Sequence, residues 1–365
     1  MKAESIMNTI VELERMVSNR IIQEDTEAIF SLLSSERDPI FSLEIIPYYA
    51  LFVQSCQEYF GGERLSEEIA LDIKNIRNHI KSYAVTFGRT KREIASIDQE
   101  QDIRFKSQIQ FEFLKNWGIY WNLGIYWTDD RHIIGNTQQL AAFMNMKDLT
   151  DNEIDEKQFE LAYQIGAFVA NVRNTLAPNL ILPVVERPIS AIKIEKYCDV
   201  NTNEHNAIFV KHTSKELNLF YLNLLCNMNF VKHILKPLFV EENTWAFRIE
   251  YVVTYYTFQA LKRLKNHCEN NHDMLVDTKE IRKLEFTGRK LFQTRFRNCM
   301  MHYNLENQGV LLSDHIEKPF FGIIENCFEG ENYQTYLMLL HEFSDKIIAY
   351  LEKQFGCDGF GLKQL

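Results

Sequence analysis

The sequence predicts an all-α protein made of two helical bundles, with a few short strands expected near residues 180–212. Glycine and proline are scarce, at 14 and 7 of 365 residues, which disfavours a fold of many strands and turns. Apolar residues recur at the three- and four-residue spacing of helices through most of the chain. Three of the seven prolines, Pro178, Pro183 and Pro188, interrupt this pattern near the middle. We therefore expect two bundles joined at this point.

The first half is expected to form an N-terminal helical domain, residues 1–177. Its predicted helices cover roughly 1–18, 42–60, 66–87, 100–127, 136–147 and 153–176. The segment WGIYWNLGIYW (117–127) holds three of the four tryptophans, so it is either a core or interface helix or an aromatic platform for bases. Because no basic residues interleave, the core or interface helix is favoured. The residues DDRH (129–132) that follow are expected to form a solvated turn.

Residues 178–212 form the predicted connecting segment, with short strands expected in ILPVV (181–185) and AIFVKH (207–212). The second bundle is expected over residues 213–365. Its predicted helices cover roughly 214–236, 243–268, 277–303 and 331–355.

The composition indicates a cytoplasmic protein that does not enter a membrane. No run of eighteen apolar residues occurs, and the amphipathic, acid-containing N-terminus is unlike a signal peptide. Seven dispersed cysteines without a CxxC pair indicate reduced thiols, not disulfides or a zinc site. The net charge of −10 argues against indiscriminate nucleic-acid binding but leaves room for a local basic groove.

The candidate site lies at the end of the predicted helix 277–303, in the stretch RFRNCMMHY. Arg295, Asn298 and His302 share one face of a regular helix, beside an apolar stripe that includes Phe296. Arg297 lies roughly 140° from His302, so the two converge only if the helix ends near His302 or if two copies pack together.

The same region is rich in positive charge. Seven basic residues face only Glu280 and Glu285; they are Lys279, Arg282, Lys283, Arg289, Lys290, Arg295 and Arg297. Arginine offers a planar fork to phosphate oxygens, and histidine can move a proton near neutral pH. This combination suits cleavage of a phosphodiester, whereas the common nucleotide-binding, serine-hydrolase and metalloprotease motifs are missing from the sequence.

The residues Arg297-Asn298-Cys299-Met300-Met301-His302 resemble the R-x(4–6)-H motif of HEPN domains, and Arg295 satisfies the longer spacing. The resemblance covers roughly residues 214–356. It implies a helical bundle, often dimeric, that works as a metal-independent ribonuclease in toxin–antitoxin, abortive-infection or CRISPR-associated defence. It also implies that Arg297 contacts phosphate, that His302 is the acid/base and that Asn298 positions the substrate.

We therefore expect an endoribonuclease that acts on RNA without a metal or cofactor. The expected catalytic residues are Arg297, Asn298 and His302, and the expected substrate contacts are Arg295, Lys290, Arg289 and Tyr303. The expected partners are RNA, a second copy or an internal pseudo-dimer, and an antitoxin or other regulatory protein. The alternative is a non-catalytic helical module that binds RNA, a nucleotide or a protein through the basic face, with a structural histidine.

Two further Arg-Asn pairs occur in the first half of the chain. Arg173 and Asn174 align with Arg297 and Asn298 and have Pro178 where the histidine would stand, as in a degenerate second copy. The other is Arg77-Asn78-His79, in KNIRNHIKSY, which has no histidine five residues after the arginine. A structural role is favoured for both pairs.

Overall fold

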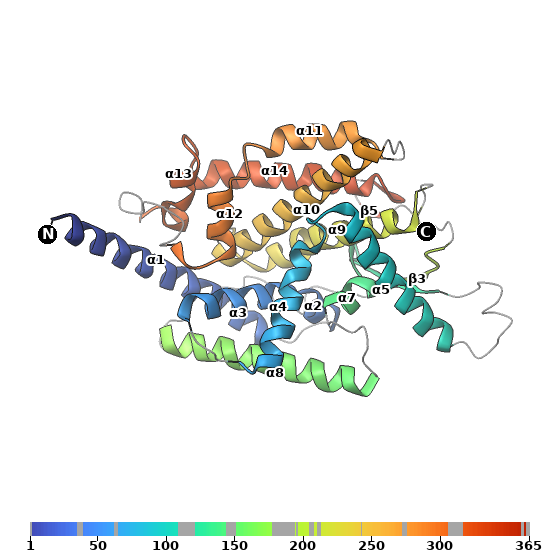
Figure 1. Cartoon of the computed structure of the whole chain (residues 1–365), viewed down its shortest axis with the longest axis horizontal. Coiled ribbons are helices and arrows are strands. Elements are labelled where there is room, and N and C mark those ends of the chain that lie inside the picture. Colours follow the sequence, from blue (N-terminus) through green and yellow to red (C-terminus); the bar gives the residue numbers. More distant parts are fainter. Residues whose placement is uncertain are drawn as a thin grey trace.

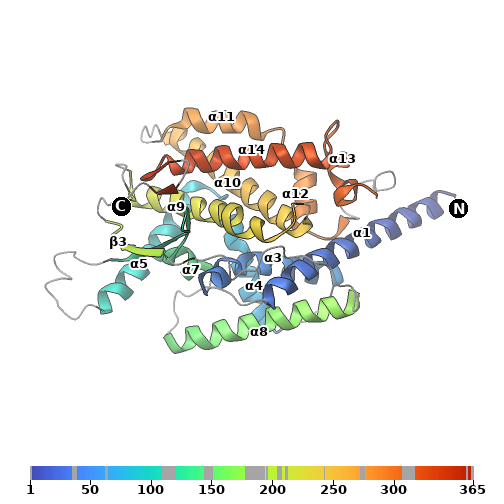
Figure 2. The same ribbon diagram turned by 180° about the vertical axis from the view of Figure 1, so that it is seen from behind.

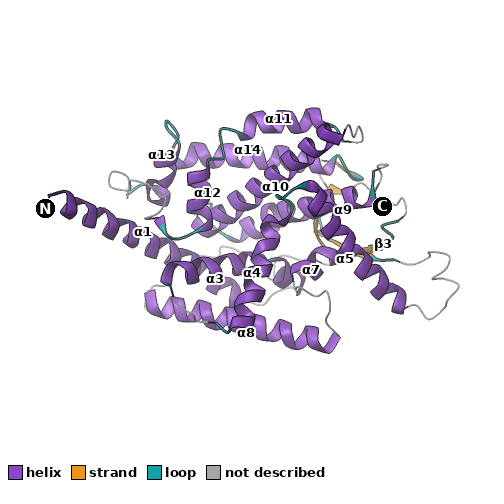
Figure 3. Ribbon diagram, viewed as in Figure 1, coloured by secondary structure: helices purple, strands orange, loops and turns teal. Residues whose placement is uncertain are grey.

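The protein is mostly helical and carries a small three-stranded antiparallel sheet (Figure 1, Figure 3). The computed structural model describes residues 2–34, 39–61, 65–108, 121–143, 151–176, 194, 196–203, 208–209, 213–241, 243–271, 276–305, 317–358 and 361–362. The all-α expectation is confirmed in this coarse form. No helix in these ranges is long and apolar enough to cross a membrane.

The first half is helical, as expected, but its first helix runs to Leu33 where the predicted one ended near residue 18, and the helix predicted at 100–127 begins at Phe87. Its helices are α1 (Lys2–Leu33), α2 (Pro39–Glu44), α3 (Ile46–Phe60), α4 (Glu67–Ser82), α5 (Phe87–Gln108), α7 (Thr137–Phe143) and α8 (Asp151–Leu176). Ser66 caps α4 by accepting a hydrogen bond from the Ile69 N–H, and Gly61 ends α3 with a left-handed φ of 64°. α8 packs along α1 (Figure 2).

The sheet replaces the end of one predicted helix. Its strands are β1 (Leu123–Trp127), β2 (Ile133–Asn136) and β3 (Lys196–Val200), in the order β2-β1-β3. The predicted helix 100–127 is therefore wrong at its C-terminal end, where LGIYW is a strand. Its β-branched and aromatic side chains suit a buried strand, and Gly124 lets the chain approach Thr137, whose hydroxyl accepts the Gly124 N–H at 3.0 Å.

Other expectations for this region have mixed outcomes. The turn at 129–132 is confirmed between β1 and β2, with Asp129, Asp130 and Arg131 exposed. β3 is a strand within 180–212. The segment ILPVV lies outside the described residues, and of AIFVKH only Ile208 and Phe209 are described, neither as a strand.

The second half also follows the predicted helices, with two interruptions. Its helices are α9 (Lys215–Asn229), which continues as a π-helix (Phe230–Leu235) and a 3-10 turn (Lys236–Leu238), then α10 (Thr244–Asn271), α11 (Thr278–Gly288), α12 (Thr294–Met301), a 3-10 turn (Pro319–Gly322), α13 (Ile323–Cys327) and α14 (Tyr333–Glu352). A two-residue ladder, β4 (Cys357–Asp358) with β5 (Gly361–Leu362), lies near the end of the chain.

The predicted helix 277–303 is two helices, not one. α11 ends at Gly288, where a Cβ would lie 2.8 Å from the rings of both Phe258 and Phe343. The chain then turns before α12 begins at Thr294. α12 is consequently free of the helical phase of α11, which changes where its polar residues can point.

Residues of both halves meet in one apolar core. Phe52 on α3 packs edge-on against Tyr303 with ring centroids 6.1 Å apart, and Tyr49 stacks on Trp245 at 6.2 Å. α1 and α10 lie together and are joined by a buried ion pair between Asp25 and Arg248. The boundaries 1–177, 178–212 and 213–365 stay predictions, but the helices on either side of them share contacts.

Candidate functional site

His302 lies directly after the last turn of α12. The helix ends at Met301, and His302 adopts an extended backbone with φ −136° and ψ 150°, while its N–H donates to the Asn298 carbonyl at 2.9 Å. The angle of 140° that separates Arg297 from His302 on a regular helix therefore does not apply to the folded chain.

Side chains from two other helices hold this helix end in place. Arg248 Nη2 on α10 donates to the Met300 carbonyl at 2.9 Å, and Ser55 Oγ on α3 donates to the Met301 carbonyl at 2.7 Å. The last carbonyls of a helix have no partner within the helix, so these donors satisfy groups that would otherwise be buried without a hydrogen bond. They also fix the position from which His302 leaves α12.

Arg248 is held in turn by a buried polar network. Asp25 is fully buried and pairs with Arg248, and it accepts hydrogen bonds from the Tyr303 hydroxyl at 2.6 Å and from the Thr244 hydroxyl at 3.3 Å. Burial raises the pKa of Asp25, although the charge of Arg248 opposes this rise. The Arg248 guanidinium also lies 4.3 Å from the centre of the Tyr303 ring.

Tyr303 is therefore a structural residue and not the substrate contact that the sequence suggested. It is 2% exposed, and its hydroxyl is committed to Asp25. The physical reason is the end of α12 at Met301, after which the chain turns the ring of Tyr303 into the core while His302 stays at the surface.

The imidazole of His302 pairs with a carboxylate from the first half of the chain. Its Nδ1 lies 2.9 Å from Glu58 Oε2, and the two side chains are 32% and 45% exposed, so solvent and ligands can reach them. The hydrogen bond with His302 lowers the pKa of Glu58, and Gln54 donates a second hydrogen bond to its Oε1 at 3.0 Å. An ionised carboxylate only accepts hydrogen bonds, so Nδ1 carries the proton and Nε2 of the neutral ring is an acceptor.

Three cationic side chains lie close enough to act electrostatically on Glu58 or on one another, and we call Arg77, Lys81 and Arg297 the basic trio. Arg77 and Lys81 come from α4, and Arg297 comes from α12. Burial, together with the charges of Arg77 and Arg297, lowers the pKa of Lys81, while Glu58 opposes this effect. Both arginines also act on the hydroxyl of Tyr256 on α10, where their charges oppose the rise in pKa caused by burial.

In each of the two arginines of the basic trio, one buried nitrogen has no hydrogen-bond partner among the described residues. Arg77 is 8% exposed, and among the described residues its Nε has no hydrogen-bond partner; the same holds for the buried Nε of Arg297. Removing a charged group from water costs several kcal/mol unless another group compensates it. An anion from outside the chain would supply that compensation.

The other expected site residues are dispersed. Asn298 is half-buried beside the motif, and its side chain makes no hydrogen bond within the described part of the chain. Arg295 instead acts electrostatically on the thiols of Cys299 and Cys327. Arg289 and Lys290 precede α12, so about 12 Å of helix separates them from its other end, where His302 lies.

Acidic neighbours pair with three of the seven basic residues of the expected surface, namely Arg282, Lys283 and Arg289. The ion pairs around α11 are Arg282–Glu269, Lys283–Glu280, Arg289–Glu285, Lys262–Glu285 and Lys265–Glu285. The surplus charge that the sequence placed along residues 279–303 therefore does not form one continuous face. The basic trio instead combines two cations of α4 with one of α12.

Of the two extra Arg-Asn pairs, one reaches the site and one does not. Arg173 is bound to Glu27 at 2.7 Å and lies over the ring of Phe30, so its role is structural, as favoured. Arg77 belongs to the basic trio, which sequence reasoning missed. The repeated Arg-Asn pair in KNIRNHIKSY was the available signal, but the chain does not reveal that Arg77 and Arg297 act on the same groups, Lys81 and Tyr256.

No protein-family model matches this chain, and no similar protein among those with curated functions and no solved structure matches it at a significant level.

Proposed function

We propose that the protein is a metal-independent endoribonuclease of HEPN type. The observation that carries the proposal is the placement of His302, held by Glu58 at 2.9 Å, next to the basic trio. Glu58 is one carboxylate beside three cations, so a phosphodiester would bring further negative charge to the trio, and it would place a ribose hydroxyl near an imidazole that can accept a proton. The resemblance of residues 297–302 to the R-x(4–6)-H motif supports the same reaction.

The proposed reaction is an internal transesterification. Nε2 of His302 takes the proton of a ribose 2′-hydroxyl, whose oxygen attacks the adjacent phosphorus. The bond from phosphorus to the 5′-oxygen of the next nucleotide breaks, and that oxygen receives a proton from the imidazolium. The products are a 2′,3′-cyclic phosphate and a free 5′-hydroxyl, so no water is consumed and no metal is needed.

Each charged group has a separate part in this reaction. Arg297 and Arg77 stabilise the charge that develops on the phosphoryl oxygens in the transition state. Glu58 keeps the proton on Nδ1 of His302 and stabilises the imidazolium that forms when Nε2 is protonated. Asn298, whose side chain is not otherwise engaged, positions the phosphate or the ribose.

The first half of the chain supplies Glu58, Arg77 and Lys81 to this site. In the family, two motif copies face each other across a dimer; here α3 and α4 take the place of the facing copy, as an internal pseudo-dimer. Such an enzyme would suit a toxin or defence effector in the cytoplasm, restrained by an antitoxin or a regulatory protein.

Incubation of the purified chain with a mixed pool of RNAs in EDTA tests the proposal. We expect cleavage with 2′,3′-cyclic phosphate and 5′-hydroxyl ends. Cleavage that requires Mg²⁺, or that leaves 5′-phosphates, would refute the mechanism. Binding of RNA without cleavage under any condition would favour the non-catalytic binding module.

A further inference from the structure

A groove of about 690 Å³ opens between α4, α5 and α10, next to the basic trio. Lys81, a member of the trio, lines the groove. Tyr256 lines it from α10, within reach of the charges of Arg77 and Arg297. The groove therefore begins where the proposed scissile phosphate would lie.

Charged, polar and apolar side chains line the groove. Polar side chains of α4 line one side, namely Asn75, Asn78 and His79. Arg89 at the start of α5 lies on the far side and is paired with Glu93 at 2.9 Å. Apolar side chains, among them Val85, Ile94 and Ile97, line the groove as well, so it offers a cation at Lys81, polar groups on α4 and an apolar wall towards α5.

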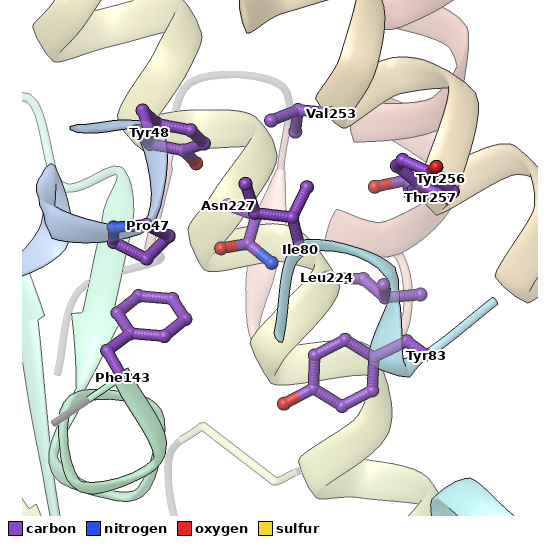
Figure 4. Close-up of a pocket in the computed structure, with 10 residues that line it drawn as sticks. All are labelled: Pro47, Tyr48, Ile80, Tyr83, Phe143, Leu224, Asn227, Val253, Tyr256 and Thr257. Atoms are coloured by element: carbon purple, nitrogen blue, oxygen red, sulfur yellow. The ribbon is translucent and has the colours of Figure 1, made fainter. Parts of the chain in front are cut away.

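Tyr256 is half-buried where it lines the groove. Its ring packs edge-on against Tyr255 with centroids 5.0 Å apart. Tyr256 and Tyr83 also line a second, much smaller pocket that lies deeper between the two halves (Figure 4). A half-buried aromatic ring with a cation beside it is the usual platform on which proteins stack an unpaired base.

From these features we infer that the groove binds the nucleotide that follows or precedes the scissile phosphate in single-stranded RNA. Its base stacks on Tyr256, its phosphate meets Lys81, and the amides of Asn75 and Asn78 contact the edge of the base. The volume suits a ligand of this size, since small-molecule sites range from about 300 to 1,000 Å³. The inference rests on the proposed function for the nature of the ligand, but it concerns binding and not cleavage.

Binding of a 2′-O-methyl RNA tests the inference, because this RNA lacks the attacking hydroxyl and cannot be cut. A fluorescent single strand of roughly 12 nucleotides would be titrated with the wild type and its variants by anisotropy. Tyr256→Ala should weaken binding about tenfold or more, and Tyr256→Phe should stay within about twofold, because the ring is retained. Tyr163→Ala is the matched control, since Tyr163 on α8 is 62% exposed and lies outside the groove.

Lys81→Gln is the second variant and guards against misfolding of Tyr256→Ala, which circular dichroism would detect. Its affinity should fall, and the dependence of log K on log salt should become shallower by about 0.7, the value for one contact with a single strand. Equal affinity for wild type, Tyr256→Ala and Lys81→Gln would overturn the inference.

The outcomes also separate this inference from the proposed function. If Tyr256→Ala cleaves and binds RNA as the wild type does, the groove is not an RNA-binding site, and the proposed nuclease activity is unaffected. If the wild type never cleaves RNA but Tyr256→Ala still weakens RNA binding, the groove is a binding site and the proposed nuclease activity is refuted. Loss of binding in Tyr256→Phe as well would mean that the hydroxyl, not the stacked ring, makes the contact, against the inference.

Discussion

Glu58 and His302 are separated by 244 positions in the chain, yet their side chains lie 2.9 Å apart at the surface between α3 and the end of α12. Like the buried pair of Asp25 and Arg248, this contact joins the two halves of the protein, but it lies at the surface. It also orients the imidazole, because a carboxylate on Nδ1 leaves Nε2 as the acceptor that faces away. The proposed chemistry depends on this orientation.

Replacement of Glu58 by glutamine tests the orienting role. Glu58→Gln should lower kcat for RNA cleavage about tenfold or more, because the imidazolium loses its counter-charge and the tautomer is no longer fixed. RNA affinity should stay equal or rise slightly, since a negative charge near the phosphate is removed. Single-turnover cleavage and anisotropy would measure the two effects separately. An unchanged kcat would show that the pair is structural.

Replacement of Arg77 by methionine tests whether the buried positive charge of Arg77 serves RNA binding and not the stability of the fold. Arg77→Met should weaken RNA binding and cleavage, while the free energy of unfolding should stay the same or increase, because a buried cation without a hydrogen-bonded partner at Nε is removed. Arg289→Met is the control, since Arg289 pairs with Glu285 on the other side of α12. Salt titrations and urea unfolding would measure both properties. A clearly less stable Arg77→Met protein with normal RNA binding would contradict the assignment.

Most helices could be located from the sequence, although the bounds of α1 and α5 were wrong, because apolar spacing and caps are local features. Ser66, Asp277 and Asn332 each accept a backbone N–H near the start of a helix, as expected for such residues. The break between α11 and α12 was not readable, since it depends on Gly288 fitting against Phe258 and Phe343 from other helices. The strand at 123–127 was missed for a related reason: short apolar runs are ambiguous without knowledge of their partners.

Half of the candidate site was likewise accessible from the sequence. Arg297 and His302 form a local motif, so their spacing alone suggested the chemistry. Glu58 contributes through its contact with His302, and Arg77 through the packing of α4 on α3; a single sequence carries no signal for contacts over such separations. Tyr303 falls on the same helical face as the buried Phe296, seven positions earlier, so that spacing already predicted its burial and its choice as a substrate contact was wrong.

The buried Asp25 network makes a prediction about stability. Asp25→Ala would leave the guanidinium of Arg248 buried without its carboxylate, which typically costs about 3–5 kcal/mol of unfolding free energy. Tyr303→Phe removes one hydrogen bond to the same carboxylate and should cost about 1–3 kcal/mol. Urea unfolding at neutral pH would measure both. Equal stability of Asp25→Ala and the wild type would show that the network does not brace the fold.

A pH dependence should come from a second histidine pair, far from the proposed site in the chain. His132 and His233 stack with ring centroids 3.7 Å apart, and burial, together with the neighbouring His132, lowers the pKa of His233 to about 3. Nearby Lys232 adds to this effect and Asp345 opposes it. Below the unfolded value of 6.5, the unfolded chain binds a proton at His233 that the folded chain does not. Stability should therefore fall as the pH drops from 6.5 towards 3.

The slope from this residue is at most about 1.4 kcal/mol per pH unit. His233→Gln should flatten the fall between pH 6.5 and pH 5, where most carboxylates are still ionised. Thermal unfolding of the two proteins at several pH values would measure it. Parallel curves for wild type and His233→Gln would contradict the assigned shift.

The most direct test of the central claim compares cleavage with binding in His302→Ala. The imidazole moves protons but adds little affinity for phosphate, so this variant should lose RNA cleavage and keep RNA binding within a few-fold of the wild type. Arg297→Ala should lose both, with a fall of about 10²–10³ in the cleavage rate. Cleavage that survives in a correctly folded His302→Ala protein, with the same 2′,3′-cyclic phosphate ends, would contradict the account.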